Sequence, residues 1–273
     1  CVTLHEEQPF SIGDVRLNTI RNAHPGLSYA YRIEDEHSAF VFASDSEYKN
    51  LVDASRQPHL DFFHDAGALI FDAQYTLGEG WVNEDWGHSS AMIGVEMALA
   101  AGVRRLLLFH HDPTNDDIVL QRIVADARAY RDELGGRGAL QIMIAHEGLA
   151  LDITPAGSVG TTLHAAGAAP ILVPSAVFDE QSVQQMAEKL VILNEADGGG
   201  QGRIIDLSQV ETLTTASLKQ LVKLQQAEGQ APLVLAAPSP SALRVIELAG
   251  LLDFFAIYPT VTAAQTAVSA RAG

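Results

Sequence analysis

Residues 85–113 read DWGHSSAMIGVEMALAAGVRRLLLFHHDP and contain the pattern from which the fold class follows. Apolar side chains with helical spacing occupy 89–101, a serine pair provides an N-cap, and Gly102 follows as a C-cap, which together predict a helix. Residues 104–109 (RRLLLF) form an apolar run that is long enough only for a buried strand. A helix followed directly by a buried strand is typical of an α/β protein.

The sequence on both sides of this stretch continues the same pattern. Before it, short β-branched, aromatic or apolar runs separated by turn residues predict four strands, at 15–24, 28–35, 38–44 and 68–73. After it, 116–134 has the spacing of a long amphipathic helix closed by two glycines, and 139–145 (ALQIMIA) predicts another strand. The later part of this region therefore alternates strand and helix.

The composition is that of a globular chain, with 47% hydrophobic and 19% charged residues among 273. These values exclude a disordered, collagen-like or coiled-coil chain, and no apolar run approaches the roughly 18 residues of a membrane span. The net charge of −17 repels phosphate backbones and anionic lipid, so we expect neither duplex nucleic acid nor a membrane as partner. The single cysteine, Cys1, allows no intrachain disulfide, which fits a cytoplasmic protein.

The length favours two domains. Residues 155–170 (PAGSVGTTLHAAGAAP) are small and lack periodicity, so we interpret them as a linker between a first domain at 1–154 and a second at 171–273. The second domain reads as a compact β/α unit, with helices expected at about 179–194, 215–228, 240–249 and 260–270 and strands at 203–207, 232–237 and 254–258. Nine of the ten histidines precede the linker, so we expect chemistry in the first domain.

Three candidate metal ligands follow predicted strands of the first domain: His24, Asp45 and His110. Strand ends hold side chains rigidly while the loop side stays open to substrate, and imidazole with carboxylate suits zinc, iron or manganese. A single histidine at a strand end is more often a hydrogen-bonded structural residue than a metal ligand. The residues alone therefore leave the ligand and structural interpretations open.

The order of three sequence words resembles the later half of the metallo-β-lactamase superfamily, in particular its phosphodiesterase and tRNA-processing branches. The words are NAHPGLSYAYRIE, FASDSEY and the 85–113 stretch, and the resemblance covers roughly residues 10–153. It implies the C-terminal half of an αββα sandwich. It also implies that His24 and His110 are metal ligands and that Asp45 bridges two divalent ions, zinc before manganese or iron.

The same resemblance assigns His88, in the word WGHSS, to catalysis and not to metal binding. At the start of a helix, its imidazole could donate a proton to a departing alkoxide. Asp72 ends a predicted strand and could orient a ligand imidazole, although a turn or capping role explains it equally well. His111 is a weaker candidate beside His110.

One departure from the superfamily concerns its HxHxDH word, which supplies most of the ligands of one metal and does not occur in these 273 residues. Three ligands do not properly hold two metals, so we expect the site to be incomplete and residues 1–273 alone to be nearly inactive. Because only 23 residues precede His24, we expect the chain to be the C-terminal part of a longer protein. The alternative is a half-domain that completes itself as a homodimer.

The second domain resembles the STAS domain of anti-sigma-factor antagonists and sulfate transporters over about 171–270. The words are RIIDLSQVETLTTASLKQLVKL at 203–224 and LAGLL at 248–252. Some members are phosphorylated on a loop serine at a helix start, where added charge ejects a partner. Here that position is Ala216, so Thr215 and Ser217 are the substitute candidates, and helix capping is the simpler interpretation of this loop.

Together the two resemblances imply a two-metal hydrolase. We expect a phosphodiesterase acting on a cyclic nucleotide or related small phosphodiester, with the STAS domain as a regulatory or protein-docking module. The alternative is a STAS-based signalling protein whose hydrolase domain is degenerate. A third interpretation keeps the hydrolase but assigns it thioester, lactone or lactam substrates, because the metal site alone does not select the bond.

Overall fold

The computed structural model describes residues 8–48, 53–153, 177–178, 203–208, 210, 212–226 and 233–271. The chain divides into two compact units, Cys1–Leu172 and Val173–Gly273, and each is described here by itself. The linker expected at 155–170 and the helix expected at 179–194 lie outside the described residues. No helix in the described part of the chain has the length and apolar character needed to cross a lipid bilayer.

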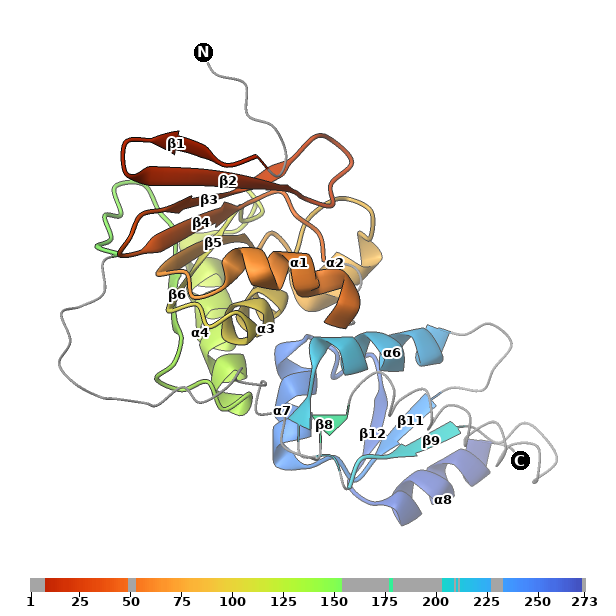
Figure 1. Cartoon of the computed structure of the whole chain (residues 1–273). Coiled ribbons are helices and arrows are strands. Elements are labelled where there is room, and N and C mark those ends of the chain that lie inside the picture. The colour runs from red at the N-terminus through yellow and green to blue at the C-terminus, as the bar shows by residue number, and fades with distance from the viewer. Residues whose placement is uncertain are drawn as a thin grey trace. The chain divides into compact units, whose positions relative to one another are not determined.

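The first unit is built on one seven-stranded sheet whose strands are hydrogen-bonded in chain order, β1 to β7 (Figure 1). The strands are β1 (Phe10–Ile12), β2 (Val15–Arg21), β3 (Tyr29–Glu34), β4 (Ala39–Ala43), β5 (Ala68–Asp72), β6 (Arg105–Phe109) and β7 (Gln141–Ile144). The first four are antiparallel hairpin strands, whereas β4 to β7 run parallel to one another. Because β3 is antiparallel to both neighbours, β2 runs in the same direction as β4, β5 and β6.

This shared direction determines where the candidate residues lie. Strands that run the same way end at the same edge of a sheet. The loops after β2, β4, β5 and β6 therefore meet at that edge, and they begin the segments that carry the histidine and carboxylate candidates. The site is thus a consequence of strand order and direction.

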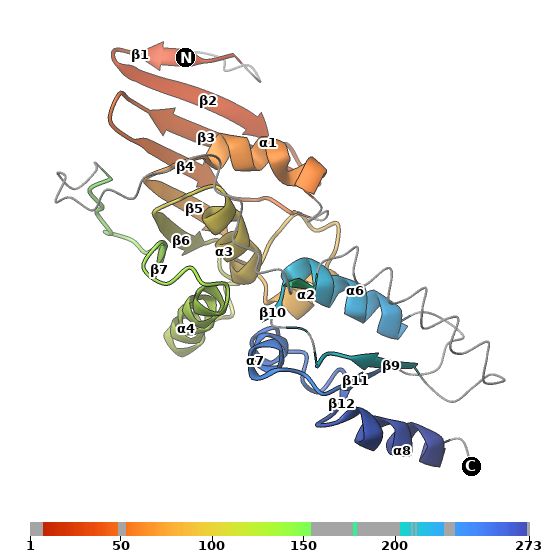
Figure 2. The same ribbon diagram turned by 60° about the horizontal axis from the view of Figure 1, so that its bottom comes forward.

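Four helices connect the strands: α1 (Asp53–Phe63), α2 (Leu77–Val82), α3 (Ala91–Ala100) and α4 (Asp117–Glu133). Figure 2 shows α1, α3 and α4 on one side of the sheet. Helix α3 packs on β5 and β6, where Leu69, Phe71, Leu106 and Leu108 are fully buried. The position of this sheet within an αββα sandwich stays a prediction.

The predicted elements of the first unit are present, with shifted ends. Helix α3 begins after Ser90, whose side chain accepts a hydrogen bond from the amide of Ile93 at 3.4 Å. Helices α1 and α2 were not predicted from the sequence. Pro58 interrupts the helical signal of α1, and two glycines within LGEGWV weaken that of α2, which depends on a capping box between Thr76 and Glu79.

The second unit contains a three-stranded parallel sheet in the order β12-β11-β9 and a separate parallel pair, β8 with β10. Its described elements are β8 (Val177–Phe178), β9 (Arg203–Asp206), β10 (Thr212–Leu213), α6 (Thr215–Gln226), β11 (Leu233–Ala236), α7 (Pro240–Leu248), β12 (Ala256–Tyr258) and α8 (Val261–Arg271). Helix α8 packs on the sheet through Ala264 and Val268, against Val234 and Ala236. The predicted β/α alternation is present wherever the chain is described.

Candidate metal centre

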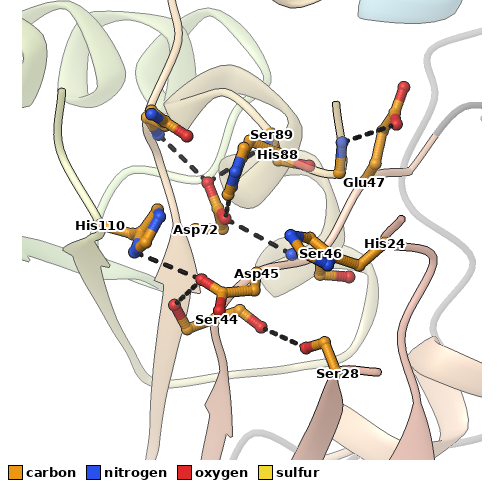
Figure 3. A network of polar contacts seen from close by, with 12 residues as sticks. His24, Ser28, Ser44, Asp45, Ser46, Glu47, Asp72, His88, Ser89 and His110 are labelled. Carbon is orange, nitrogen blue, oxygen red and sulfur yellow. Dashed lines mark hydrogen bonds and ion pairs between the residues drawn. The ribbon is translucent and has the colours of Figure 1, made fainter. Parts of the chain in front are cut away.

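Four side chains of the first unit converge at the common strand edge (Figure 3). Asp45, Asp72, His88 and His110 each place one potential ligand atom so that all four atoms lie within 4.8 Å of one another. They come from the ends of β4, β5 and β6 and from the residues just before α3. We call this group the edge cluster. Imidazole nitrogens and carboxylate oxygens at this spacing fit a divalent ion such as zinc, manganese or iron.

Asp45 and His110 occupy the solvent-facing side of the edge cluster. Nδ1 of His110 lies 3.3 Å from Oδ1 of Asp45, and the hydroxyl of Ser44 donates to the same oxygen at 3.1 Å. Both residues have left-handed backbones, with φ of 52° for Asp45, two positions after β4, and 56° for His110, directly after β6. Such conformations are costly for residues other than glycine and are concentrated at functional sites. These two residues therefore have the placement expected of metal ligands.

Asp72 has a different position, because it is fully buried and the protein already uses both of its oxygens. Oδ2 lies 2.8 Å from Nδ1 of His88, and backbone amides of Ser46, Gln74 and Ser89 donate to the carboxylate at 3.2–3.4 Å. A carboxylate so fully hydrogen-bonded is a poor candidate for the inner ligand sphere and a good one for orienting an imidazole. The sequence indicated such an orienting role, and the ring that Asp72 contacts is that of His88.

The contact with Asp72 determines which nitrogen of His88 faces the site. When Nδ1 carries the proton that Asp72 accepts, Nε2 is the nitrogen left for substrate or solvent. The hydrogen bond to Asp72 raises the pKa of His88 above its ordinary value, and burial opposes this rise more weakly. The imidazole of His88 also stacks on that of His110, with ring centroids 4.8 Å apart. His88 is therefore held in one orientation and biased toward its protonated form.

His24 lies beside the edge cluster and not within the four-residue group. Its ring is edge-on to that of His88, with centroids 5.4 Å apart, and its Nδ1 accepts a hydrogen bond from the amide of Gly26 at 3.0 Å. That bond places the ring proton on Nε2. For His24 to bind a metal through either nitrogen, the hydrogen bond from Gly26 must break.

His111 does not join the edge cluster. Its Nε2 lies 3.1 Å from the carbonyl oxygen of Leu108. Burial lowers the pKa of this histidine, so the neutral form is favoured. This geometry is that of a structural histidine at the end of β6.

Hydrogen bonds from Asn22 and Glu47 hold the loops of the site together, and the sequence did not indicate either residue. The side chain of Asn22 donates to the carbonyl of Ser44 at 2.9 Å, and Glu47 accepts backbone hydrogen bonds from the loop before His88. The serines and the glutamate belong to the word FASDSEY, which the sequence identified because of Asp45. Their partners lie far along the chain, and no local pattern indicates them.

The loop before α6 in the second unit contains the substitute phosphorylation candidates. Thr215 and Ser217 are both fully buried. The hydroxyl of Thr214 accepts from the amide of Ser217 at 3.2 Å, and the amide of Thr214 donates to the hydroxyl of Ser217 at 2.8 Å. This reciprocal pair is a helix cap. Phosphorylation of either candidate would require the start of α6 to open.

Comparisons with known proteins agree with both halves of this description. Residues 167–264 match the STAS domain family. A segment of 96 residues is 33% identical to the ribonuclease Z of Kineococcus radiotolerans, over 35% of this chain and 28% of that protein. A segment of 109 residues is 26% identical to the probable metallo-hydrolase YhfI of Bacillus subtilis, and it covers 40% of this chain and 41% of YhfI. The chain thus spans less than half the length of these curated relatives.

Among solved structures, the metallo-β-lactamase fold protein YhfI of Bacillus subtilis superposes with a TM-score of 0.42 at 23% identity, covering 54% of each chain. The short form of human tRNase Z superposes with a TM-score of 0.39 at 14% identity, covering 54% of this chain and 46% of that one. The sequence matches confirm both predicted resemblances, a metallo-β-lactamase-like N-terminal part and a STAS domain.

Proposed function

We propose that this chain, which joins a metallo-β-lactamase-like hydrolase part to a STAS domain, belongs to a metal-dependent phosphodiester hydrolase. The observation that carries the proposal is the edge cluster, in which Asp45, Asp72, His88 and His110 converge at one end of the sheet. The sequence similarity to a ribonuclease Z and to a probable metallo-hydrolase supports this class. We propose a small phosphodiester as the substrate and a protein as the partner of the STAS domain.

The geometry of the edge cluster assigns different roles to its residues, metal binding on one side and proton transfer on the other. Asp45 and His110 would hold a divalent ion, and His24 would join them once Gly26 releases its ring nitrogen. These three residues would be one part of a two-metal site, whose other ligands the HxHxDH word supplies in the superfamily. Two ions held in this way would supply a hydroxide near neutral pH and neutralise a phosphoryl oxygen. The positive charge of two metal ions would also allow a chain with a net charge of −17 to bind an anionic ester.

His88 would act as the general acid. Asp72 holds the proton of Nδ1 and stabilises the imidazolium, so Nε2 can carry a second proton toward the site. Donation of that proton to the leaving alkoxide would leave a neutral imidazole that is still anchored by Asp72. The burial of Asp72 matters here, because a fully hydrogen-bonded carboxylate keeps the ring in place through the reaction.

Zinc titration of the purified chain, after removal of metal by chelation and dialysis, tests the proposal. We expect calorimetry to detect saturable binding that Asp45→Asn weakens at least about tenfold, because the variant loses an anionic ligand. Glu36→Gln is the matched control, since it also removes one negative charge but from an exposed hairpin turn. Absence of zinc binding, or equal weakening in both variants, would contradict the proposed metal site.

The bond specificity needs its own assay. With zinc or manganese present, we expect this chain, which lacks the HxHxDH word, to have only slow residual turnover. That residual turnover should be faster on bis(4-nitrophenyl) phosphate than on a thioester or a lactam reporter, and His88→Ala should lose it. A higher rate on the thioester or the lactam would overturn the phosphodiester assignment while leaving the metal site intact.

A further inference from the structure

Glu47 connects three loops that carry residues of the candidate metal centre. Its amide donates to the carbonyl oxygen of Ala23 at 2.9 Å, which ties it to the loop of His24. Its Oε1 accepts from the amide of Asp85 at 3.1 Å, and its Oε2 accepts from the amide of Gly87 at 3.2 Å. Glu47 itself lies two positions after Asp45 (Figure 3).

The loop that Glu47 holds packs directly on the ring of His24. A methyl group at Gly87 would lie 2.3 Å from Cδ2 of His24 and 2.6 Å from Cδ of Pro25, and the backbone of Gly87 has a φ of +90°. Only glycine combines that conformation with so close an approach. Gly87 also immediately precedes His88, so the position of its backbone fixes the Cα position from which the side chain of His88 extends.

We propose that Glu47 is a positioning residue that fixes the loops of His24 and His88 against the loop of Asp45. This inference rests on the proposed function of the edge cluster. An ionised carboxylate is suited to the task, because it accepts two amides at once and charge-assisted hydrogen bonds are the stronger class. Glu47 is half-buried. Its carboxylate contacts the backbone amides of Asp85 and Gly87, so it holds this loop independently of the side chains that the loop carries.

A small hollow of about 210 Å³ adjoins this carboxylate and is lined by Ala23, His24, Pro25, Glu47 and Asp85. Its lining comes from the same three loops. If the Glu47 contacts were lost, the loop of His88 could move into this space, and the rings of His24 and His88 would separate. The carboxylate therefore acts on the candidate metal centre through the loops and does not need to touch substrate.

The decisive experiment compares Glu47→Ala and Glu47→Gln with the parental full chain, free of metal, by nuclear magnetic resonance. In Glu47→Ala we expect amide exchange at Gly87 to become at least tenfold faster and the ring resonances of His24 and His88 to shift. Glu47→Gln keeps one carbonyl acceptor and should give an intermediate effect. The ring of His146, which is exposed at the end of a different strand, is the internal reference, and Glu36→Ala is the control variant.

Unchanged exchange at Gly87 with unchanged rings of His24 and His88 would overturn the positioning role. An equal shift at His146 would also overturn it, because the variant would then perturb the whole unit. Zinc titration of the same variants is a separate readout, with at least tenfold weaker binding expected in Glu47→Ala. If the parental chain binds no zinc, the proposed function fails while the resonance data still decide the role of Glu47.

Discussion

Asp72 and His88 show how one contact assigns a chemical role to each partner. The carboxylate is fully buried and the imidazole is 14% exposed, so their 2.8 Å contact is shielded from solvent. Because the contact occupies Nδ1, the opposite nitrogen is left for chemistry. The same contact raises the pKa of His88, so the contact can be tested through the pH dependence of stability.

The stability of the metal-free chain should depend on His88 in a pH-dependent way. A histidine whose pKa is higher in the folded than in the unfolded state stabilises the fold below the unfolded pKa of about 6.5, and this contribution is lost as the pH rises through the folded pKa. We therefore expect His88→Gln to lower the free energy of unfolding by about 1 kcal/mol more at pH 5.5 than at pH 9. Urea denaturation with a chelator present measures this difference, with His146→Gln as the control for loss of one exposed imidazole. A larger loss at pH 9 would contradict the assignment.

At the scale of elements, the contact between α3 and the sheet holds the segment that carries His88. Gly94 of α3 faces the buried ring of Phe71, and a methyl group there would lie 2.7 Å from Cδ1 of that ring. The ring cannot move aside freely, because it stacks on Tyr48 with centroids 5.2 Å apart. A glycine is thus required by packing within a helix that would otherwise favour alanine.

Gly94→Ala should destabilise the first unit by about 1–3 kcal/mol, because overpacking outweighs the gain in helix propensity. Gly80→Ala in α2 is the matched control. There the new methyl group would lie 3.8 Å from Cβ of Tyr75, an ordinary contact, so we expect no loss of stability or a gain of up to about 1 kcal/mol. Chemical denaturation followed by circular dichroism compares the two. Equal effects in both variants would show that packing against Phe71 does not decide the outcome.

At the scale of the whole molecule, the two compact units should respond differently to metal. The edge cluster belongs to the first unit, and in the described part of the second unit no comparable group of histidines and acidic residues occurs. A ligand that binds only the folded state raises stability by about 2.7 kcal/mol at a concentration one hundred times its dissociation constant.

Zinc should therefore raise the melting temperature of one calorimetric transition and leave the other unchanged. Asp45→Asn should reduce the shift to about half or less at that zinc concentration, because its zinc binding is at least about tenfold weaker, without altering the second transition. A zinc-induced shift of both transitions, or the same shift in Asp45→Asn, would contradict a metal site confined to the first unit.

The α/β class and most of the strands and helices follow from the sequence alone, because they depend on local periodicity, capping and turn residues. Both family resemblances also follow from the sequence, because short sequence words in a fixed order carry them. Asp45, Asp72 and His110 were indicated because each lies at the end of a predicted strand, whereas His88 was indicated by the resemblance of the word WGHSS. The sequence did not reveal α1 and α2, whose proline and glycines weaken the helical signal. Which of these candidates meet depends on the tertiary structure, because strand direction brings the four together and leaves His24 beside them and His111 turned to a backbone carbonyl. The role of Glu47 also depends on the tertiary structure, because that side chain holds an amide 40 positions away, and a contact of that range depends on how the strands pair and not on any local pattern.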